Sequence, residues 1–484
     1  MSRNTKIVAT YGPAVASEDA LTALISAGAD VLRLNFSHGE YSEHEAAVKL
    51  IRKVSTKLGK SVAILQDLRG PKIRVGVLCP EPVMLREDDV VTLVPHTEIE
   101  DVSTGGPPIE TEAARLIPIE GYPTLHEDIA VGEMILLADG AIALRVGAID
   151  GVRIRCDVVV EGEISSHKGV NFPESRLRTL ETITEKDVRD LEFGLAHGVD
   201  WIALSFVRSA ADVEELKRRI ASHGSEVPVI AKIEKREALR NLEEIVSASD
   251  GVMVARGDLG VETELEEVVL RQKEIIRACN RRGRVVITAT QMLESMMHHP
   301  TPTRAEVADV SNAIFDGTDA LMLSGETAVG EYPVEAVSFM ARAAEQVEEA
   351  LDADRLLAQR PFLDEVPDAV AHAACMTAHE IAAEAMICLT RSGLTARLVS
   401  RYRPRCPVIA VSPEERTIRR LAIHWGVLPV LLTEDLDGEA LVEGALAKAR
   451  STGLLAEGDR VVITAGVSPG VLRGKTNLIR AEVL

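Results

Sequence analysis

Strand-like apolar runs alternate with amphipathic helical stretches in this chain, and this alternation restricts the possible folds more than any other feature. Eight such units occupy roughly residues 1–70 and 175–350. Strands that alternate with helices predict a parallel sheet, and eight units predict a closed (β/α)8 barrel of the TIM type. A doubly wound open sheet is the alternative, because the number of strands alone does not exclude it. The predicted strands cover residues 6–10, 31–36, 61–67, 201–206, 229–234, 251–255, 285–290 and 320–323.

Polar side chains stand at, or just past, the carboxyl ends of these predicted strands. Barrel enzymes carry out their chemistry at that end, because the loops that follow the strands all open onto one face. The repeated placement therefore favours the barrel over the open sheet. The residues concerned are Arg33, Asn35, Ser37, Asp67, Lys232, Glu234, Asp258, Thr290 and Ser324.

Two further segments differ from the barrel pattern. Between residues 70 and 168, short alternating strands and the hairpin dipeptides Asp139-Gly140 and Asp150-Gly151 predict a small β-barrel domain inserted in one barrel loop, a natural lid. From about residue 351 a separate α/β pattern predicts a domain with a mainly parallel sheet, preceded by a linker over 355–367. The predicted division is 1–70 and 169–350 for the barrel, 71–168 for the lid and 351–484 for the C-terminal domain.

The charge balance limits the classes of partner. Among 484 residues, 54 Lys and Arg against 75 Asp and Glu give a net charge of −21, which opposes unspecific binding to nucleic acid or to an anionic membrane. The six cysteines are scattered without a CxxC pair, and no apolar run is long enough for a signal core or a membrane span. We therefore predict a cytoplasmic protein that binds neither nucleic acid nor membrane.

Two apolar strands lead directly into charges, in Ala231-Lys232-Ile233-Glu234 and Ala255-Arg256-Gly257-Asp258. Ionised side chains are almost never buried unless they are paired or bind a metal. Lys232 and Glu234 are two residues apart and point to the same side of a strand. With Asp258 after the next strand they could hold a divalent metal and a phosphate together. A structural ion pair and a simple turn at Asp258 are the plainer explanations, which the joint position on adjacent strands disfavours.

Other polar groups also have plainer explanations. Arg33 lies inside an apolar strand, which argues against a solvated surface arginine, whereas Arg74 could be one. Thr290 and Ser324 could cap backbone at the strand ends. Residues 470–476 resemble a phosphate-binding Walker A loop, but they have three residues instead of four between the glycines and too few residues after them for the required helix. We reject that interpretation.

Several stretches of the chain resemble signatures of the pyruvate kinase family and occur in the family's order. They cover the barrel and the lid, while the C-terminal third resembles the family less specifically. The chain departs from the family's pattern at Tyr11, at Ala138 and at Pro173-Glu174-Ser175, none of which belongs to the central charged group. The stretches are TKIVATYGPA, RLNFSHG, DLRGPKIR, LLADGAI, HKGVN, LSFVR, IAKIE, VMVARGDLGVE, ITATQMLESM, PTRAEVADVSNAI and DGTDALMLSGETAVGEYP.

The resemblance implies a phosphotransferase that moves the phosphoryl group of phosphoenolpyruvate to ADP and yields ATP and pyruvate, the last step of glycolysis. It assigns Lys232 to stabilising the charge of the phosphoryl group in flight and Arg33 to holding that group. Glu234 and Asp258 would bind Mg2+, for which Mn2+ can substitute.

The resemblance also implies how the carboxylate end of the substrate is held. The backbone at Gly257, together with Asp258 and Thr290, would position it. The enolate left behind must be protonated, and Thr290 or Ser324 with water are the candidates; which group delivers the proton stays open.

The nucleotide and a monovalent cation have matching residues as well. The resemblance places ADP or ATP at Asn35, His38, Arg74 and Lys168 as the lid closes. It matches the family's monovalent-cation pocket with Asn35, Ser37, Asp67 and the carbonyl of Leu68.

The most specific expectation concerns K+ and depends on Lys72. This residue stands where K+-dependent members carry Glu, and Leu68 and Val75 stand where they usually carry Thr. We predict that the Lys72 ammonium replaces K+, so that Mg2+ is required and K+ is not. The alternative is a solvated loop lysine in an enzyme that still needs K+.

In the C-terminal domain, a loop at a predicted helix start matches the family's effector site. It comprises Thr390, Arg391, Ser392, Gly393 and Thr395, where free amides favour a phosphate. The resemblance implies an allosteric sugar phosphate or AMP, and a homotetramer. Helix capping by Ser392 or Thr395 is the simpler explanation.

Two other classes of protein stay open. One is a related barrel enzyme that forms a Mg2+-bound enolate without a nucleotide, which Arg74, Lys168 and the predicted lid disfavour. The other is a non-catalytic sugar-phosphate sensor, although every charge of the active group is present.

Overall fold

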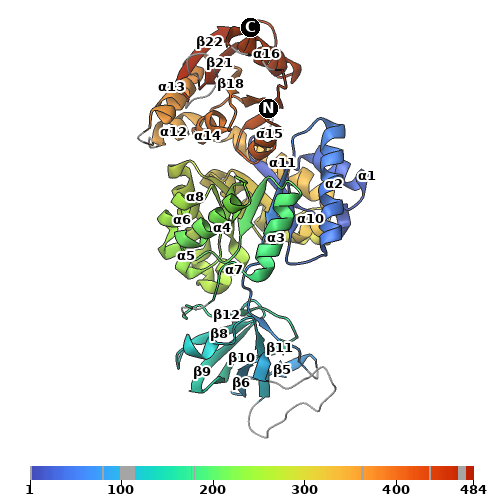
Figure 1. Cartoon of the computed structure of the whole chain (residues 1–484), viewed down its shortest axis with the longest axis vertical. Helices are drawn as coiled ribbons and strands as arrows, with labels where there is room; N and C mark the ends of the chain where they lie inside the picture. Colours follow the sequence, from blue (N-terminus) through green and yellow to red (C-terminus); the bar gives the residue numbers. More distant parts are fainter. Residues whose placement is uncertain are drawn as a thin grey trace.

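The computed structural model of the chain describes residues 3–78, 81–98, 115–175, 177–178, 180–360, 363, 365–434, 436, 438–466 and 476–484. Three parts follow one another along its long axis: a β domain, a central barrel and an α/β domain that carries the C-terminus (Figure 1). Except for Thr476, the segment that resembles a Walker A loop lies outside the described residues.

Eight parallel strands close into a barrel in the order β1-β17-β16-β15-β14-β13-β3-β2. This closure confirms the predicted TIM-type barrel and excludes the doubly wound open sheet. Closing the sheet also leaves no edge strand with unpaired backbone groups. The strands are β1 (Lys6–Thr10), β2 (Val31–Asn35), β3 (Ala63–Asp67), β13 (Trp201–Leu204), β14 (Val229–Ile233), β15 (Gly251–Ala255), β16 (Val285–Ala289) and β17 (Ala320–Leu323).

Aliphatic side chains form both layers of the barrel core. Seven of the eight strands are buried at every position. The eighth, β2, is only partly buried at Arg33 and Asn35. Successive strand residues point to opposite faces, so one set fills the interior and the other packs beneath the helices. A chain with 3% aromatic residues can fill this interior because small and branched aliphatic side chains suit the tapering layers.

Helices surround the barrel, and their starts show the expected capping. The Ser17 hydroxyl accepts from the Ala20 amide at 3.2 Å at the start of the first helix, and Thr184 and Thr303 each begin a capping box. The helices are α1 (Glu18–Ala27), α2 (Tyr41–Leu58), α3 (Glu185–Ala196), α4 (Ala210–Ser222), α5 (Arg236–Arg240), α6 (Leu242–Ala248), α7 (Arg256–Glu262), α8 (Val268–Arg282), α9 (Arg304–Asp316), α10 (Gly325–Ala328) and α11 (Pro333–Glu349).

One of these helices corrects an expectation from the sequence. Asp258 was explained alternatively as a turn residue, because it lies between glycines. In the structure it lies in the first turn of α7, which follows β15 without a loop. The turn explanation is therefore wrong, and the carboxylate is held by a helix start at the carboxyl end of the barrel.

The inserted domain is a barrel-like sheet of short strands. Seven strands pair in the order β12-β8-β9-β10-β6-β7-β4, and the two end strands approach each other through the bridge between Arg74 and Gly169. β12 lies just beyond residue 168, and the domain limits stay predictions. The seven strands are β4 (Arg74–Val75), β6 (Val90–Pro95), β7 (Arg115–Glu120), β8 (Met134–Leu137), β9 (Ile142–Asp150), β10 (Arg153–Val160) and β12 (Val170–Asn171). β5 (Val83–Leu85) and β11 (Gly162–Ile164) pair with each other as a separate two-stranded sheet.

The C-terminal domain has the predicted, mainly parallel sheet. Four strands run parallel in the order β20-β19-β18-β21, and β22 pairs antiparallel with β21. The stretch 355–367 predicted as a linker includes most of α12, so it is partly helical. The elements are α12 (Ala353–Gln359), α13 (Val366–Glu380), β18 (Ala385–Leu389), α14 (Leu394–Arg401), β19 (Val408–Ser412), α15 (Glu415–Leu421), β20 (Val427–Leu431), α16 (Gly438–Ser451), β21 (Arg460–Ala465) and β22 (Leu478–Val483).

The two outer domains contact opposite ends of the barrel (Figure 1). Residues just before strands, Asp200 and Asp319, pair with Arg419 at 2.9 Å and with Arg403 at 2.8 Å. Lys6, at the start of β1, donates to the carbonyl of Val427 at 2.8 Å. The C-terminal domain thus covers the amino ends of the barrel strands, and the carboxyl ends face the lid.

The described residues include free cysteines. No helix in this part of the chain combines the length and the apolar character needed to cross a membrane. Its cysteines are free thiols: Cys156, Cys279, Cys375, Cys388 and Cys406. Burial raises the pKa of the Cys156 thiol to about 12, so this thiol is held in its unreactive protonated form.

His424 makes the contact between barrel and C-terminal domain sensitive to acid. It is 7% exposed, its ring centre lies 6.0 Å from that of Trp201, and burial, with Arg397 and Lys6, lowers its pKa to about 3. The unfolded chain therefore binds a proton below about pH 6.5 that the folded chain does not bind. We expect the free energy of unfolding to fall by about 1 kcal/mol between pH 7 and pH 5.5 through this group.

Urea unfolding of the unmodified chain and of His424→Gln at both pH values measures this effect. The difference between their two pH dependences isolates His424 from the carboxylates, which titrate in both chains. Equal pH dependences would contradict the expectation.

Candidate active site

Lys232 lies at the centre of a group of charges at the carboxyl end of the barrel. Its Nζ atom lies 2.8 Å from Oε1 of Glu234 and 3.4 Å from Oδ1 of Asp67, and it donates to the Ser205 hydroxyl at 2.8 Å. Burial disfavours the ammonium, but Asp67 and Glu234 outweigh burial, so the pKa of Lys232 is raised. The side chain is therefore a fixed positive charge.

Asp67 joins a second cation to the first. Its Oδ2 atom pairs with Nε of Arg33 at 2.7 Å, and Nη1 of Arg33 donates to the Thr10 hydroxyl at 3.1 Å. Burial opposes ionisation of Asp67, yet Lys232 and Arg33 hold its pKa below the usual range. One buried carboxylate from β3 thus holds cations from β2 and β14 side by side, an arrangement suited to a multiply charged phosphoryl group.

Two carboxylates beside Lys232 form a possible metal site. Oε2 of Glu234 accepts from the Phe206 amide at 2.6 Å. Burial and the charge of Asp258 raise the pKa of Glu234, against the influence of Lys232. A divalent cation between them would relieve this repulsion. Among the described residues no group of three or more His, Cys, Asp or Glu forms a metal cage, and Mg2+ commonly takes one or two carboxylates and completes its shell with water and substrate oxygens. The pair fits such an ion.

Gly257 and Thr290 meet at the adjoining loop. The Gly257 amide donates to the Thr290 hydroxyl at 2.8 Å. Thr290 has φ 67° and Gln291 has φ 54°, a left-handed conformation that costs a residue with a side chain roughly 1–3 kcal/mol. This strain places the Thr290 hydroxyl at the start of α7. Ser324 directly follows β17, and its amide donates to the Glu326 carboxylate at 2.7 Å.

The predicted nucleotide residues are divided between barrel and lid. Arg74 lies on β4 and its Nη1 atom donates to the carbonyl of His167 at 2.7 Å, next to Lys168. Asn35 ends β2 and His38 follows it, with the His38 amide donating to the carbonyl of Asn35 at 3.3 Å. The structure therefore brings both sets to the side of the barrel that the lid faces.

Lys72 lies at the joint between lid and barrel. Its Nζ atom is 3.4 Å from Oδ1 of Asp258 and 3.9 Å from Oδ1 of Asp139 in the lid. The groups of the predicted monovalent-cation pocket have partners of their own. Oδ1 of Asn35 accepts from the Ser37 amide at 3.1 Å, and the carbonyl of Leu68 accepts from the Ser205 hydroxyl at 2.7 Å. The Lys72 ammonium thus sits beside the possible metal site.

Sequence reasoning missed three residues of this group. Ser205 and Thr10 orient Lys232 and Arg33, and Arg256 binds the loop that carries Thr290. All three stand at, or just after, the carboxyl end of a barrel strand. The criterion that selected the other candidates would have found them, had it been applied to every polar residue at those positions.

Comparison with known proteins shows the family to which the chain belongs. The family description "Pyruvate kinase, barrel domain" matches residues 2–337, and "Pyruvate kinase, alpha/beta domain" matches residues 368–481. The chain belongs to the pyruvate kinase family. It is 46% identical to pyruvate kinase 2 of Synechocystis, over the whole of this chain and 80% of that one. It is 42% identical to the pyruvate kinase of Clostridium acetobutylicum over the full length of both.

A solved structure supports the same conclusion. The crystal structure of a pyruvate kinase from Cryptosporidium parvum matches with a TM-score of 0.91 and 36% identity, and covers 99% of this chain and 96% of that one. Pyruvate kinases are phosphotransferases that act on phosphoenolpyruvate and ADP and form pyruvate and ATP, generally with a divalent metal. The predicted family, enzyme class and fold are thereby confirmed.

Proposed function

We propose that this chain transfers the phosphoryl group of phosphoenolpyruvate to ADP at the group of charges around Lys232. The observation that carries the proposal is the pairing of Arg33 and Lys232 on Asp67, beside the carboxylates of Glu234 and Asp258. Phosphoryl transfer needs positioned positive charge more than covalent chemistry, and this group supplies it.

An assay of pyruvate formation coupled to lactate dehydrogenase tests the proposal. We expect turnover only when ADP and phosphoenolpyruvate are both present. Pyruvate formed without ADP would indicate an enolate-forming enzyme that needs no nucleotide. Binding of phosphoenolpyruvate without any turnover would indicate a sensor.

The positions of the residues support each proposed role. Arg33 and Lys232 bind the phosphoryl group and stabilise its charge, and Gly257 and Thr290 position the carboxylate end of the substrate. Glu234 and Asp258 would hold Mg2+ or Mn2+, which when bound neutralises charge on the phosphate and carboxylate oxygens. Thr290 or Ser324, with water, are the candidates to protonate the enolate. Asn35, His38, Arg74 and Lys168 bind the nucleotide.

We also propose that the chain needs no K+. In this proposal the Lys72 ammonium, which lies 3.4 Å from Oδ1 of Asp258, supplies a positive charge at the same end of the barrel as the pocket of Asn35, Ser37, Asp67 and the carbonyl of Leu68. Asp67 already has two cationic partners, which supports a site that is neutralised from within the protein.

An allosteric site in the C-terminal domain is a further part of the proposal. Thr390, Arg391, Ser392 and Thr395 line a cavity of about 270 Å³ beside the start of α14. The Thr390 hydroxyl accepts from the Gly393 amide at 2.9 Å, and the Ser392 hydroxyl accepts from the Leu394 amide at 3.5 Å. These bonds agree with the capping explanation. The cavity and the Arg391 side chain, which is nearly half exposed, support a phosphate ligand.

A sugar phosphate or AMP should therefore lower the half-saturating concentration of phosphoenolpyruvate. We expect Thr390→Ala with Ser392→Ala to raise the effector concentration needed for half of that shift about 30-fold, because two phosphate contacts at roughly 1 kcal/mol each are lost. Activity without effector should stay unchanged, since the loop lies in the domain at the other end of the barrel (Figure 1). A panel of sugar phosphates and AMP that produces no shift in the unmodified enzyme would contradict the site.

The remaining assignments concern assembly and location. We propose a homotetramer in the cytoplasm, because this is the arrangement that the family resemblance implies. Sedimentation equilibrium should give four times the chain mass of 52.3 kDa. A mass of one or two chains at assay concentration would contradict the tetramer.

A further inference from the structure

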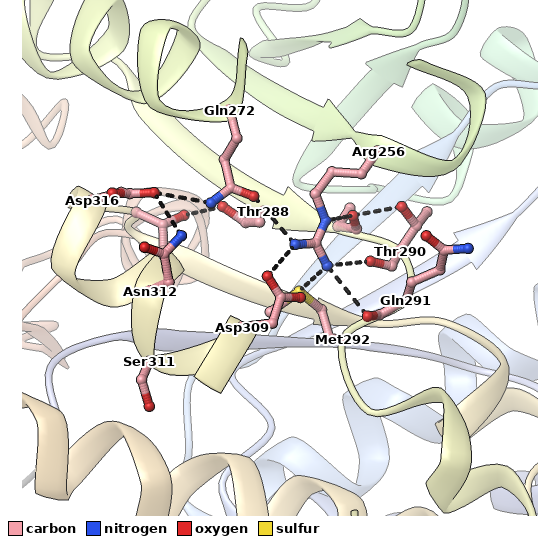
Figure 2. A network of polar contacts seen from close by, with 12 residues as sticks. Arg256, Gln272, Thr288, Thr290, Gln291, Met292, Asp309, Ser311, Asn312 and Asp316 are labelled. Atoms are coloured by element: carbon pink, nitrogen blue, oxygen red, sulfur yellow. Dashed lines mark hydrogen bonds and ion pairs between the residues drawn. The ribbon is translucent and has the colours of Figure 1, made fainter. Parts of the chain in front are cut away.

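Arg256 follows β15 directly, and its guanidinium lies against the loop after β16 (Figure 2). Its Nη2 atom donates to the carbonyl of Thr290 at 2.6 Å and to that of Gln291 at 3.3 Å. Its Nε atom donates to the carbonyl of Ala289 at 3.2 Å. One side chain, itself 9% exposed, thus binds three successive carbonyls.

The other side of the guanidinium is anchored on two helices. Nη1 donates to Oδ1 of Asp309 on α9 at 2.7 Å and to Oε1 of Gln272 on α8 at 3.2 Å. Gln272 in turn donates to Asp316 at 3.0 Å. Figure 2 shows this chain of contacts running from the loop to α9.

These contacts exclude direct substrate binding by Arg256. An arginine has five N–H donors in a planar fork and does not lose its proton in proteins. Here each of the three nitrogens has at least as many acceptors as it has hydrogens, since Nη2 also contacts the sulfur of Met292 at 2.8 Å, so none is left for a phosphate or a carboxylate. The role of Arg256 must therefore act through the groups that it holds.

The loop that Arg256 holds is the strained one. A β-branched residue such as Thr290 rarely has a positive φ, and such a conformation persists only where the surroundings enforce it. Arg256 binds the carbonyl of Thr290, while the amide of the next residue, Gly257, binds the Thr290 hydroxyl at 2.8 Å. Two consecutive residues, Arg256 and Gly257, therefore bind the carbonyl and the hydroxyl of Thr290.

We propose that Arg256 is a positioning residue, which holds Thr290 in its left-handed conformation so that its hydroxyl stays beside the Gly257 amide. The inference rests on the proposed function, in which these two groups position the carboxylate end of the substrate. A lysine cannot replace the arginine, because a single ammonium cannot span three carbonyls and a carboxylate in one plane.

The first measurement compares Arg256→Lys with a matched variant, Arg52→Lys. The Arg52 guanidinium also binds two carbonyls, of Val62 and Gly198 at 3.0 Å, and one carboxylate, of Asp200 at 2.7 Å, but at the other end of the barrel. We expect Arg256→Lys to lower kcat about 100-fold, the cost of a small misplacement of a reacting group. KM for ADP should stay within about twofold, and Arg52→Lys should keep the activity of the unmodified enzyme.

A double-mutant cycle asks whether Arg256 acts through Thr290. If it does, Arg256→Lys should cost little in a Thr290→Ala background, because the group it positions is already absent. In Arg256→Ala, added guanidinium should restore part of kcat, and it should not raise the activity of the unmodified enzyme. A merely structural role would give neither the coupling nor the rescue.

Three outcomes would overturn the inference. Arg256→Lys could behave like Arg52→Lys, the effects of Arg256→Lys and Thr290→Ala could multiply independently, or guanidinium could leave Arg256→Ala unchanged. If the Arg256 variants do not fold by circular dichroism, Asp309→Asn replaces them and should lower kcat about tenfold, again only when Thr290 is present. Failure of the proposed function can be distinguished from failure of this inference, because the unmodified chain would then form no pyruvate from phosphoenolpyruvate and ADP.

Discussion

Lys232→Met should lower kcat at least about 100-fold while phosphoenolpyruvate binding stays nearly intact. The ammonium contacts Ser205, Asp67 and Glu234 together, and it is held protonated by the two carboxylates. Charge that is positioned for the transition state is worth about 3 kcal/mol or more when one contact is removed. Arg33 still pairs with Asp67 in the variant, so a binding site for the phosphoryl group remains.

Steady-state kinetics and calorimetric titration with phosphoenolpyruvate separate the two effects. Lys235→Met is a suitable control, because Lys235, three residues further along the chain, is also a lysine in an ion pair, at 2.6 Å from Glu262. It should keep kcat within about threefold. A Lys232→Met enzyme that keeps kcat and shows only a raised KM would contradict the assigned role.

Lys72→Glu should turn an enzyme that is indifferent to K+ into one that requires it. In the unmodified chain, the ammonium lies at 3.4 Å from Asp258, and its stem packs over Gly169, where a Cβ would lie 3.1 Å from Cε of Lys72. The variant would place a carboxylate beside Asp258 and remove the internal cation, so that repulsion must be relieved by an added ion. Activity without K+ should fall at least about tenfold, and KCl should restore most of it.

The assay uses buffers in which tetramethylammonium is the only monovalent cation, with Mg2+ present, before and after addition of KCl. Lys53→Glu makes the same charge change at an exposed lysine that pairs with Glu18 and should remain independent of K+. Lys72→Gln, which removes the charge without adding a carboxylate, should be less active than the unmodified enzyme. Strong stimulation of the unmodified enzyme by KCl would refute the claim.

Much of the fold follows from patterns within single elements. The alternation of apolar strands with amphipathic helices gave the barrel, because each strand is buried along its whole length and each helix on one face. Polar residues at strand ends gave the candidate site for a topological reason, since all carboxyl ends of a parallel barrel meet on one face. The α/β pattern after residue 351 gave the parallel sheet of the last domain in the same way.

Local patterns failed where an element is stabilised by distant parts of the chain. The Gly-Asp-Leu-Gly segment 257–260 has two glycines and is typical of a turn, yet it is helical in α7, with Leu259 fully buried. The predicted linker includes most of α12, whose Leu357 is 6% exposed in the core of the C-terminal domain. In both cases tertiary packing overrides local preference.

The contacts that give the site its chemistry lie beyond any local pattern. Lys72 meets Asp258 across 186 residues, and Arg33 meets Asp67 across 34. A strand's sequence tells which side chains share a face, but not which strand lies next to it or at what register. The closed barrel supplies both, because its order puts β14 between β13 and β15. The sequence alone therefore determined which residue types stand at the ends of the strands. The partners of Lys232, Lys72 and Arg256 were decided by the tertiary structure, because they depend on how the strands close into a barrel and on where the lid and α7 pack against that barrel.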